Sequence, residues 1–209
     1  MLETSLVAFA TFFATIGPPD VAVVFVALTT NKASGERRRL ALKAALIGSA
    51  ILLFFAFLGK PLLTYLGISL AALRTAGGIL LLLIAIDMVF ARISGGTSTT
   101  AEENAEAAGR DDISVFPLAT PLIAGPGAIG AAILLIADAQ GDPLQIMIVT
   151  GALIAVLFIT FLLMIAASQF QKLFGVTGAH VVSRVLGILL AALAVQFLFD
   201  GIKESGLLA

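Results

Sequence analysis

The sequence contains no cysteine and a single histidine, His180, among its 209 residues. Without cysteine, the chain can form neither a disulfide nor a thiolate metal site, and its redox environment cannot be read. A single histidine also excludes a cluster of histidine ligands. We therefore predict no metal site and no cofactor.

Charged residues are scarce as well. They make up 12% of the chain, whereas 60% of the residues are hydrophobic, and the mean hydropathy of +1.12 lies far above that of a soluble globular domain. This composition predicts a multi-pass protein of the lipid bilayer. The net charge of −1, with no large basic block, argues against nucleic acid as a partner.

Three further absences narrow the function. No glycine-rich phosphate-binding loop is present, which disfavours ATP-driven transport by this chain alone. No basic residue precedes the first apolar run, which begins after "MLETS", so we expect this run to be retained as a membrane span. No Gly-x-Gly-Asp arrangement, serine–histidine pair or metal-ligand cluster is present. Because Asp20 and Asp87 also have different predicted depths, an intramembrane enzyme that uses them as a catalytic dyad is disfavoured. We expect the protein not to be an enzyme.

Six apolar segments are long enough to cross a hydrocarbon core about 30 Å thick. They cover approximately residues 5–30, 40–59, 67–91, 113–138, 143–167 and 180–202. Between the third and the fourth lies a stretch rich in Gly, Ser, Thr and acids. We therefore divide the chain into a first three-helix half, 1–91, a cytoplasmic linker, 92–112, and a second half, 113–209.

The basic residues predict the orientation. Nine of the 12 Lys and Arg residues fall on one side of this six-span arrangement, which should be cytoplasmic. They are Lys32, Arg37, Arg38, Arg39, Lys43, Arg92, Arg110, Lys172 and Arg184. Both termini are then expected on the opposite, non-cytoplasmic side of the membrane.

The first span is interrupted by "ATIGPPDVAVVF", residues 14–25. Pro18 and Pro19 lack N–H groups and clash with a preceding helical turn, so the helix must kink or break there. Because lipid cannot satisfy the freed backbone groups, this segment should line a cavity or a packed interior.

The fourth span carries a similar interruption. "TPLIAGPGAIGAAILLI", from Thr120, resembles the first-span motif, with Gly125-Pro126 in the place of Gly17-Pro18. The third spans of the two halves are also alike, with Arg74 in the place of Arg184. Because each half has three spans, the second copy must enter the membrane in the opposite direction. The sequence thus predicts an all-α membrane protein of two inverted three-helix repeats with broken first and fourth spans.

"PLATPLIAGPGAI", residues 117–129, resembles the second-repeat signature of the MarC family of bacterial inner-membrane proteins, and the resemblance covers essentially the whole chain. That family is related to small neutral amino acid transporters and, more distantly, to the lysine exporter superfamily. The resemblance implies a bacterial inner membrane, with both termini in the periplasm, and a neutral amino acid as substrate.

A half-helix that begins inside the membrane presents free N–H groups and a positive dipole end. The run Gly125, Pro126, Gly127 and Ala128 supplies such a start, and we predict that it binds a substrate carboxylate. The alternative is a kink that only lets helices pack. In the first repeat, Gly17 and Pro18 form the break, and Asp20 follows in the first turn of the next helix.

Asp20 could complement the helix dipole, hold a substrate ammonium or carry a coupling ion, H⁺ or Na⁺. Asp87, near the end of the third span, is a second candidate for ion coupling, although it could instead reach the membrane interface. Thr15 and Thr120 flank the breaks and could cap freed backbone groups or contact substrate. Gln196 could hydrogen-bond a ligand or another helix. Arg74 is expected to extend towards the lipid headgroups.

We therefore expect a secondary transporter that moves a small zwitterionic metabolite, a neutral amino acid, by alternating access. The competing hypothesis is a channel-like or regulatory membrane protein without carrier activity. The sequence leaves the oligomeric state open.

Overall fold

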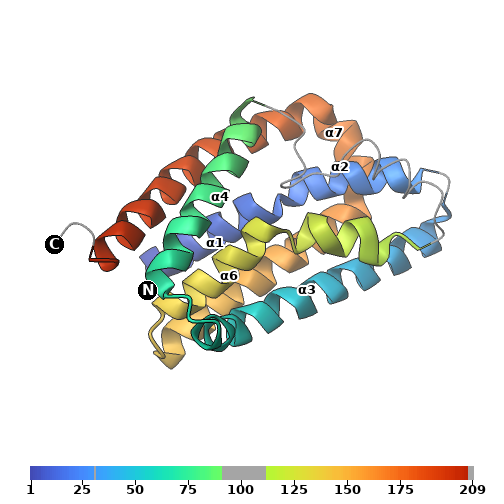
Figure 1. Ribbon diagram of the computed structural model, residues 1–209. Coiled ribbons are helices and arrows are strands. Elements are labelled where there is room, and N and C mark those ends of the chain that lie inside the picture. The colour runs from blue at the N-terminus through green and yellow to red at the C-terminus, as the bar shows by residue number, and fades with distance from the viewer. Residues whose placement is uncertain (31, 91–111, 207–209) are drawn as a thin grey trace.

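The computed structural model describes residues 1–30, 32–90 and 112–206, apart from the side chains of residues 167–180, 182 and 183. The described chain is helical and contains no strand (Figure 1). Its elements are α1 (Leu2–Ile16), α2 (Pro18–Thr29), α3 (Ser34–Tyr65), α4 (Leu70–Phe90), the π-helix η1 (Ser114–Ile123), α6 (Pro126–Asp138) and α7 (Pro143–Glu204).

These elements supply the six spans expected from the sequence. Five are apolar helical stretches, Leu2–Thr29, Ser34–Tyr65, Leu70–Phe90, Pro143–Ala166 and Arg184–Glu204, and the sixth is the bent pair of η1 and α6. The last two stretches are parts of the single helix α7, which was expected as two separate helices. Figure 1 shows that the two arms of α7 run in opposite directions. The all-α membrane fold is confirmed, whereas the predicted linker 92–112 lies almost entirely outside the described residues.

The first span breaks at Gly17. Gly17 has φ 60° and ψ 57°, a left-handed conformation that glycine adopts without a steric penalty. Its N–H donates to the carbonyl of Phe13 at 3.0 Å, which closes α1. Pro18 then occupies the first position of α2, where its missing N–H removes no intrahelical bond.

The fourth span is interrupted more strongly. Phe116 and Thr120 have extended backbone angles inside η1, and a proline follows each of them. The residue before a proline is driven out of the helical region by its ring, which explains both interruptions. α6 restarts at Pro126 with Gly125 as its N-cap, and the axes of η1 and α6 differ by 55°.

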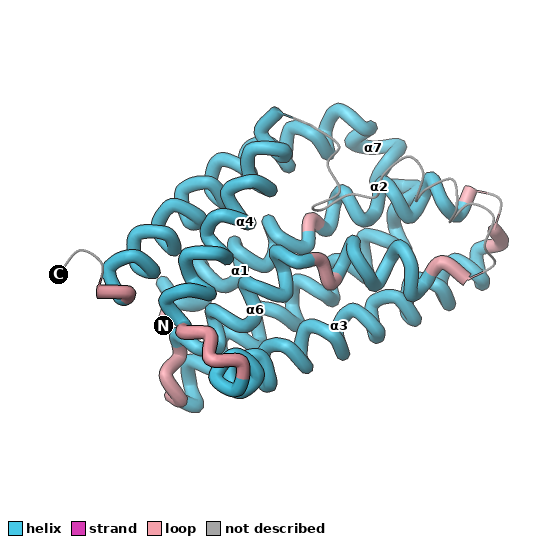
Figure 2. The backbone as a smooth tube through the Cα atoms, in the orientation of Figure 1, coloured by secondary structure: helices cyan, strands magenta, loops and turns pink. Residues whose placement is uncertain are grey.

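The N-terminus and the C-terminal end of α7 lie at the same end of the bundle, which we call the terminal end, and α2 ends and α3 begins at the opposite end (Figure 1). The tube in Figure 2 shows short loops between the described helices at both ends. An even number of spans requires the two termini to share a side. Which membrane face the terminal end occupies stays a prediction, as does the inverted repeat.

Glycines let α4 and the second arm of α7 pack closely and antiparallel. A β-carbon on Gly78 would lie 2.8 Å from the carbonyl oxygen of Ala194, and one on Gly187 would lie 2.9 Å from Cβ of Met88. Nearer the terminal end, a β-carbon on Gly201 would lie 2.8 Å from the backbone nitrogen of Thr75. The third spans of the two halves thus form one tightly packed helix pair.

α3 covers the bent span in the same way. β-carbons on Gly48 and Gly59 would lie 2.6 Å from Ile123 and 2.5 Å from Ile133, respectively. Ile123 ends η1 and Ile133 lies in α6, so one helix packs against both halves of the bent span. The break between them is therefore held inside the bundle.

Candidate functional site

The two breaks meet inside the molecule. A β-carbon on Gly127, in the first turn of α6, would lie 3.9 Å from the methyl group of Thr15, close to the end of α1. Thr15 is only 2% exposed, and its hydroxyl donates to the carbonyl of Thr11 at 2.8 Å. This bond lies within α1, and the methyl group of Thr15 faces Gly127. Both roles predicted for Thr15 at the break stay predictions.

No side chain caps the backbone N–H groups at the start of α6. Its N-cap, Gly125, makes no side-chain hydrogen bond, and the first turn holds no acidic residue. Ile129 is the first residue whose N–H bonds back to Gly125, at 3.0 Å. The N–H groups of Gly127 and Ala128 therefore precede the intrahelical ladder and sit at the positive end of the helix dipole.

Access to this start is uneven. Gly125, Gly127 and Ala128 are buried, whereas Pro126 between them is exposed. A β-carbon on Gly127 would lie 2.5 Å from Cδ1 of Ile84, so a larger residue here would have to displace the end of that side chain on α4. The packing alternative therefore accounts for Gly127, and the carboxylate role rests on the uncapped N–H groups.

The start of α2 is different because it carries its own acid. Its first two residues, Pro18 and Pro19, have no N–H, and Asp20 follows in the same turn. The Asp20 carboxylate folds back over the break, with Oδ2 3.2 Å from the position of a β-carbon on Gly17. Asp20 itself is partly exposed. One break thus presents donors, and the other presents a carboxylate.

The remaining predicted residues lie at different distances from the breaks. Thr120 is exposed on extended backbone within η1. Asp87 is partly exposed on α4, one helical turn beyond Ile84, the residue that packs on Gly127. Gln196 is exposed, and it donates to Asp200 on its own helix at 3.0 Å. This bond lies within one helix, and the predicted contact of Gln196 with a ligand stays a prediction.

The prediction for Arg74 is wrong. Arg74 does not extend towards the headgroups, because the residue is only 8% exposed. Its guanidinium forms ion pairs with Asp138, the last residue of α6, and with Glu204, the last residue of α7. The Nε of Arg74 is buried with no hydrogen-bond partner among the described residues. An unmade bond of this kind costs about 1–3 kcal/mol. We call Arg74, Asp138 and Glu204 the Arg74 cluster.

A second ion pair lies towards the opposite end. Lys43 of α3 pairs with Asp112, and Asp112 also accepts a hydrogen bond from the backbone N–H of Ser114 at 3.0 Å. The Lys43 ammonium, with the Ser114 hydroxyl and N–H, holds the pKa of the Asp112 carboxyl well below its usual range. This contact ties the start of the bent span to α3.

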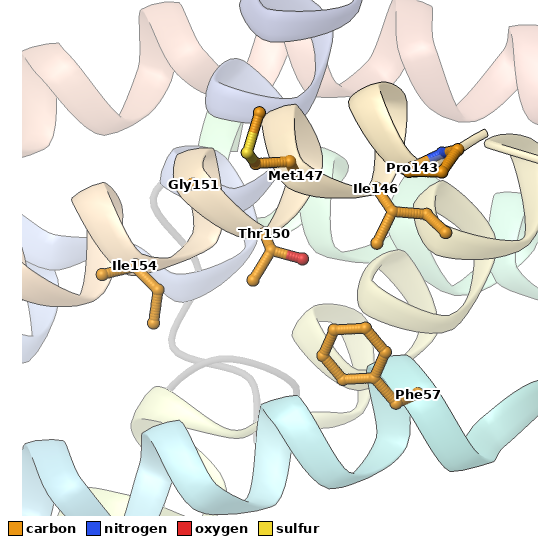
Figure 3. Close-up of a pocket in the computed structure, with 7 residues that line it drawn as sticks. All are labelled: Phe57, Pro143, Ile146, Met147, Thr150, Gly151 and Ile154. Atoms are coloured by element: carbon orange, nitrogen blue, oxygen red, sulfur yellow. The ribbon is translucent and has the colours of Figure 1, made fainter. Parts of the chain in front are cut away.

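The outer surface carries an apolar groove. A cavity of about 620 Å³ lies between α3 and the first turns of α7. Figure 3 shows Phe57 of α3 facing the α7 residues that line it. A neighbouring cavity of about 280 Å³ continues between the same two helices. None of the predicted site residues lines either cavity, so the breaks remain the candidate site. The described residues contain no group of three His, Asp or Glu side chains that could hold a metal ion.

Known proteins resemble this chain over nearly its full length. The model of the MarC family, described as integral membrane proteins, matches residues 2–205. A UPF0056 membrane protein of Archaeoglobus fulgidus is 37% identical over 94% of this chain and 91% of its own length. The UPF0056 membrane protein YhcE of Escherichia coli is 34% identical, over 93% and 90%, respectively. No solved structure matches the chain. This chain belongs to the MarC family of integral membrane proteins.

Proposed function

We propose that the protein is a secondary transporter that carries a small zwitterionic metabolite, a neutral amino acid, across a bacterial inner membrane by alternating access. It would act without chemical conversion of its substrate. The observation that carries the proposal is the meeting of two broken spans in the interior, with Thr15 of the first beside Gly127 of the second. Transporters built on inverted repeats bind their substrates where broken helices meet.

The two breaks offer complementary chemistry to a zwitterion. The N–H groups of Gly127 and Ala128, at the positive end of α6, suit a substrate carboxylate. Asp20, at the other break, suits a substrate ammonium or a coupling ion, H⁺ or Na⁺. Asp87, one turn from the packing contact of Gly127, is the second candidate for the coupling ion. An α-amino acid carries both required charges within a few bonds.

Thermal unfolding of the purified protein tests this chemistry. Alanine as a zwitterion would be compared with propionate, which keeps only the carboxylate, and with ethylamine, which keeps only the ammonium. A ligand at 100 times its Kd stabilises the folded form by about 2.7 kcal/mol. For a chain of this size, such stabilisation raises the Tm by about 5–10 °C.

We expect alanine to raise the Tm more than either half-molecule does, and Asp20→Asn to remove the advantage of alanine over propionate. Equal shifts with propionate and alanine would restrict the site to anions. If no small neutral amino acid shifts the Tm, the competing hypothesis of a channel-like or regulatory protein is favoured.

A further inference from the structure

We propose that the ion pair between Arg74 and Asp138 is the gate that closes the terminal end of the molecule, and that α6 links this gate to the substrate site. The inference rests on the proposed alternating access. It concerns a cluster that lies at the far end of α6 from the helix start discussed above.

The Arg74 cluster joins three spans that come from distant parts of the sequence. Arg74 lies in the second turn of α4, and its two partners end α6 and α7. α4 and the second arm of α7 are already held together by close glycine contacts along their length. The bond to Glu204 therefore lies within a packed helix pair, whereas the bond to Asp138 connects that pair to the broken span.

Each charged residue of the Arg74 cluster lies at the end of its helix where the helix dipole disfavours its charge. Asp138 and Glu204 lie at the negative ends of α6 and α7, and Arg74 lies near the positive end of α4. Each charge opposes its own helix dipole and is compensated by its partners in the cluster. The Arg74–Asp138 contact is thus stable while α6 touches α4, and the compensation is lost when the two separate.

α6 is a short, direct connection between the gate and the substrate site. It has 13 residues, so Pro126 at its start and Asp138 at its end lie about 18 Å apart along the axis. A substrate that changes the tilt of the α6 start would change the position of Asp138. Movements of a half-helix against a fixed helix pair are the kind of motion by which inverted-repeat transporters alternate access.

The contact directly beneath the gate provides a reporter position. Leu134 lies one turn before Asp138, is 0% exposed, and packs 2.9 Å from the position of a β-carbon on Gly77 of α4. Because the sequence contains no cysteine, Leu134→Cys introduces the only thiol in the chain. Its rate of modification by a membrane-impermeant, charged methanethiosulfonate added on the terminal side then measures how often the gate opens.

Within the cluster the proposal distinguishes two bonds. Arg74→Gln and Asp138→Asn, each in the Leu134→Cys chain, should raise the modification rate about tenfold or more, which corresponds to about 1.4 kcal/mol. Glu204→Gln should leave the rate within about twofold of the parent, because the glycine contacts still hold its helix pair. Arg184→Gln is the matched control, since Arg184 is the aligned arginine and is exposed.

Equal modification rates in the parent, Arg74→Gln and Asp138→Asn chains, all monodisperse in detergent, would overturn the gate. Failure of both variants to fold would also overturn it, because the cluster would then be needed for structure. The modification rate of the cysteine is measured without any substrate. A gate response without any carrier activity would therefore refute the transport proposal alone, and carrier activity without a gate response would refute only this inference.

Discussion

At the scale of single residues, Asp20 is the residue on which the proposed chemistry depends most. An acid in the first turn of a helix gains about 0.3–1 kcal/mol from the dipole. A carboxylate near the membrane centre costs about 2.5–3.5 kcal/mol on the insertion scale. The dipole alone therefore does not account for an acid at this depth.

We predict that Asp20→Asn abolishes uptake in proteoliposomes or makes it independent of pH, while the protein stays folded. Asparagine keeps the shape and an acceptor oxygen but removes the charge. Uptake by both proteins would be measured as a function of pH, from mildly acidic to neutral conditions. Superimposable curves of rate against pH would return Asp20 to the role of a helix-start acid.

Asp112 gives a residue-scale prediction about stability. Because folding lowers the pKa of this carboxyl, its contribution is present above the usual aspartate pKa of about 3.9 and is lost as the pH falls below that value. The side chain is 49% exposed, so solvent screening limits the contribution to about 1 kcal/mol or less.

We therefore expect Asp112→Asn to lower the Tm slightly at pH 7, and the difference from the wild type to shrink steadily as the pH falls below about 3.9. Thermal unfolding of both proteins across this range provides the measurement. A difference in Tm that persists unchanged in acid would mean that the Lys43–Asp112 ion pair is not its source.

At the scale of helices, the tightest contact that the glycines describe is between α4 and α7. Gly78→Ala would place its β-carbon 2.8 Å from the carbonyl oxygen of Ala194 and 3.0 Å from the backbone nitrogen of Leu198. Backbone atoms cannot move aside as flexible side chains do, so we predict a loss of about 1–3 kcal/mol.

Gly151→Ala is the matched control. Gly151 also lies inside a helix, but a β-carbon there would meet nothing within 4 Å. Alanine should be neutral or stabilise the protein by about 0.5–1 kcal/mol, because glycine is the poorer helix former. If thermal unfolding shows that Gly151→Ala is less stable than Gly78→Ala, the close contact between α4 and α7 at Gly78 would be contradicted.

The sequence predicted the helices and their breaks because the responsible physics is local. Apolar length fixes a span, and Pro18 and Pro126 lack N–H groups whatever surrounds them. The role of Arg74 depends on Asp138 and Glu204, which are distant in the chain, so no local pattern revealed it. The sequence did contain an indication of this cluster. Arg74, Asp138 and Glu204 lie at ends of predicted spans, and in a chain of six alternating spans these three ends are on the same side of the membrane. The side chain of Gln196 bonds to Asp200 one turn along its own helix, and its predicted contact with a ligand stays a prediction.

At the scale of the whole molecule, the fold predicts a topology. The N-terminus and the C-terminal end of α7 share the terminal end, and the cluster of Arg37–Arg39 lies at the start of α3, at the opposite end. Because positive residues favour the cytoplasmic side, we expect the terminal end to face the periplasm.

Reporter fusions after Ala209 check this topology. Alkaline phosphatase, which is active only in the periplasm, should be active there, and a fluorescent protein that folds only in the cytoplasm should stay dark. The reverse pattern would contradict the predicted orientation and would place the Arg74 gate on the cytoplasmic side.

The central claim is that the protein is a carrier, and counterflow tests it most directly. Proteoliposomes would be loaded with unlabelled small neutral amino acids and diluted into a trace of the same labelled amino acids. A carrier that alternates access should accumulate label transiently above equilibrium and should saturate with substrate. Label that only equilibrates without an overshoot, or that enters no faster than in protein-free liposomes, would contradict the account.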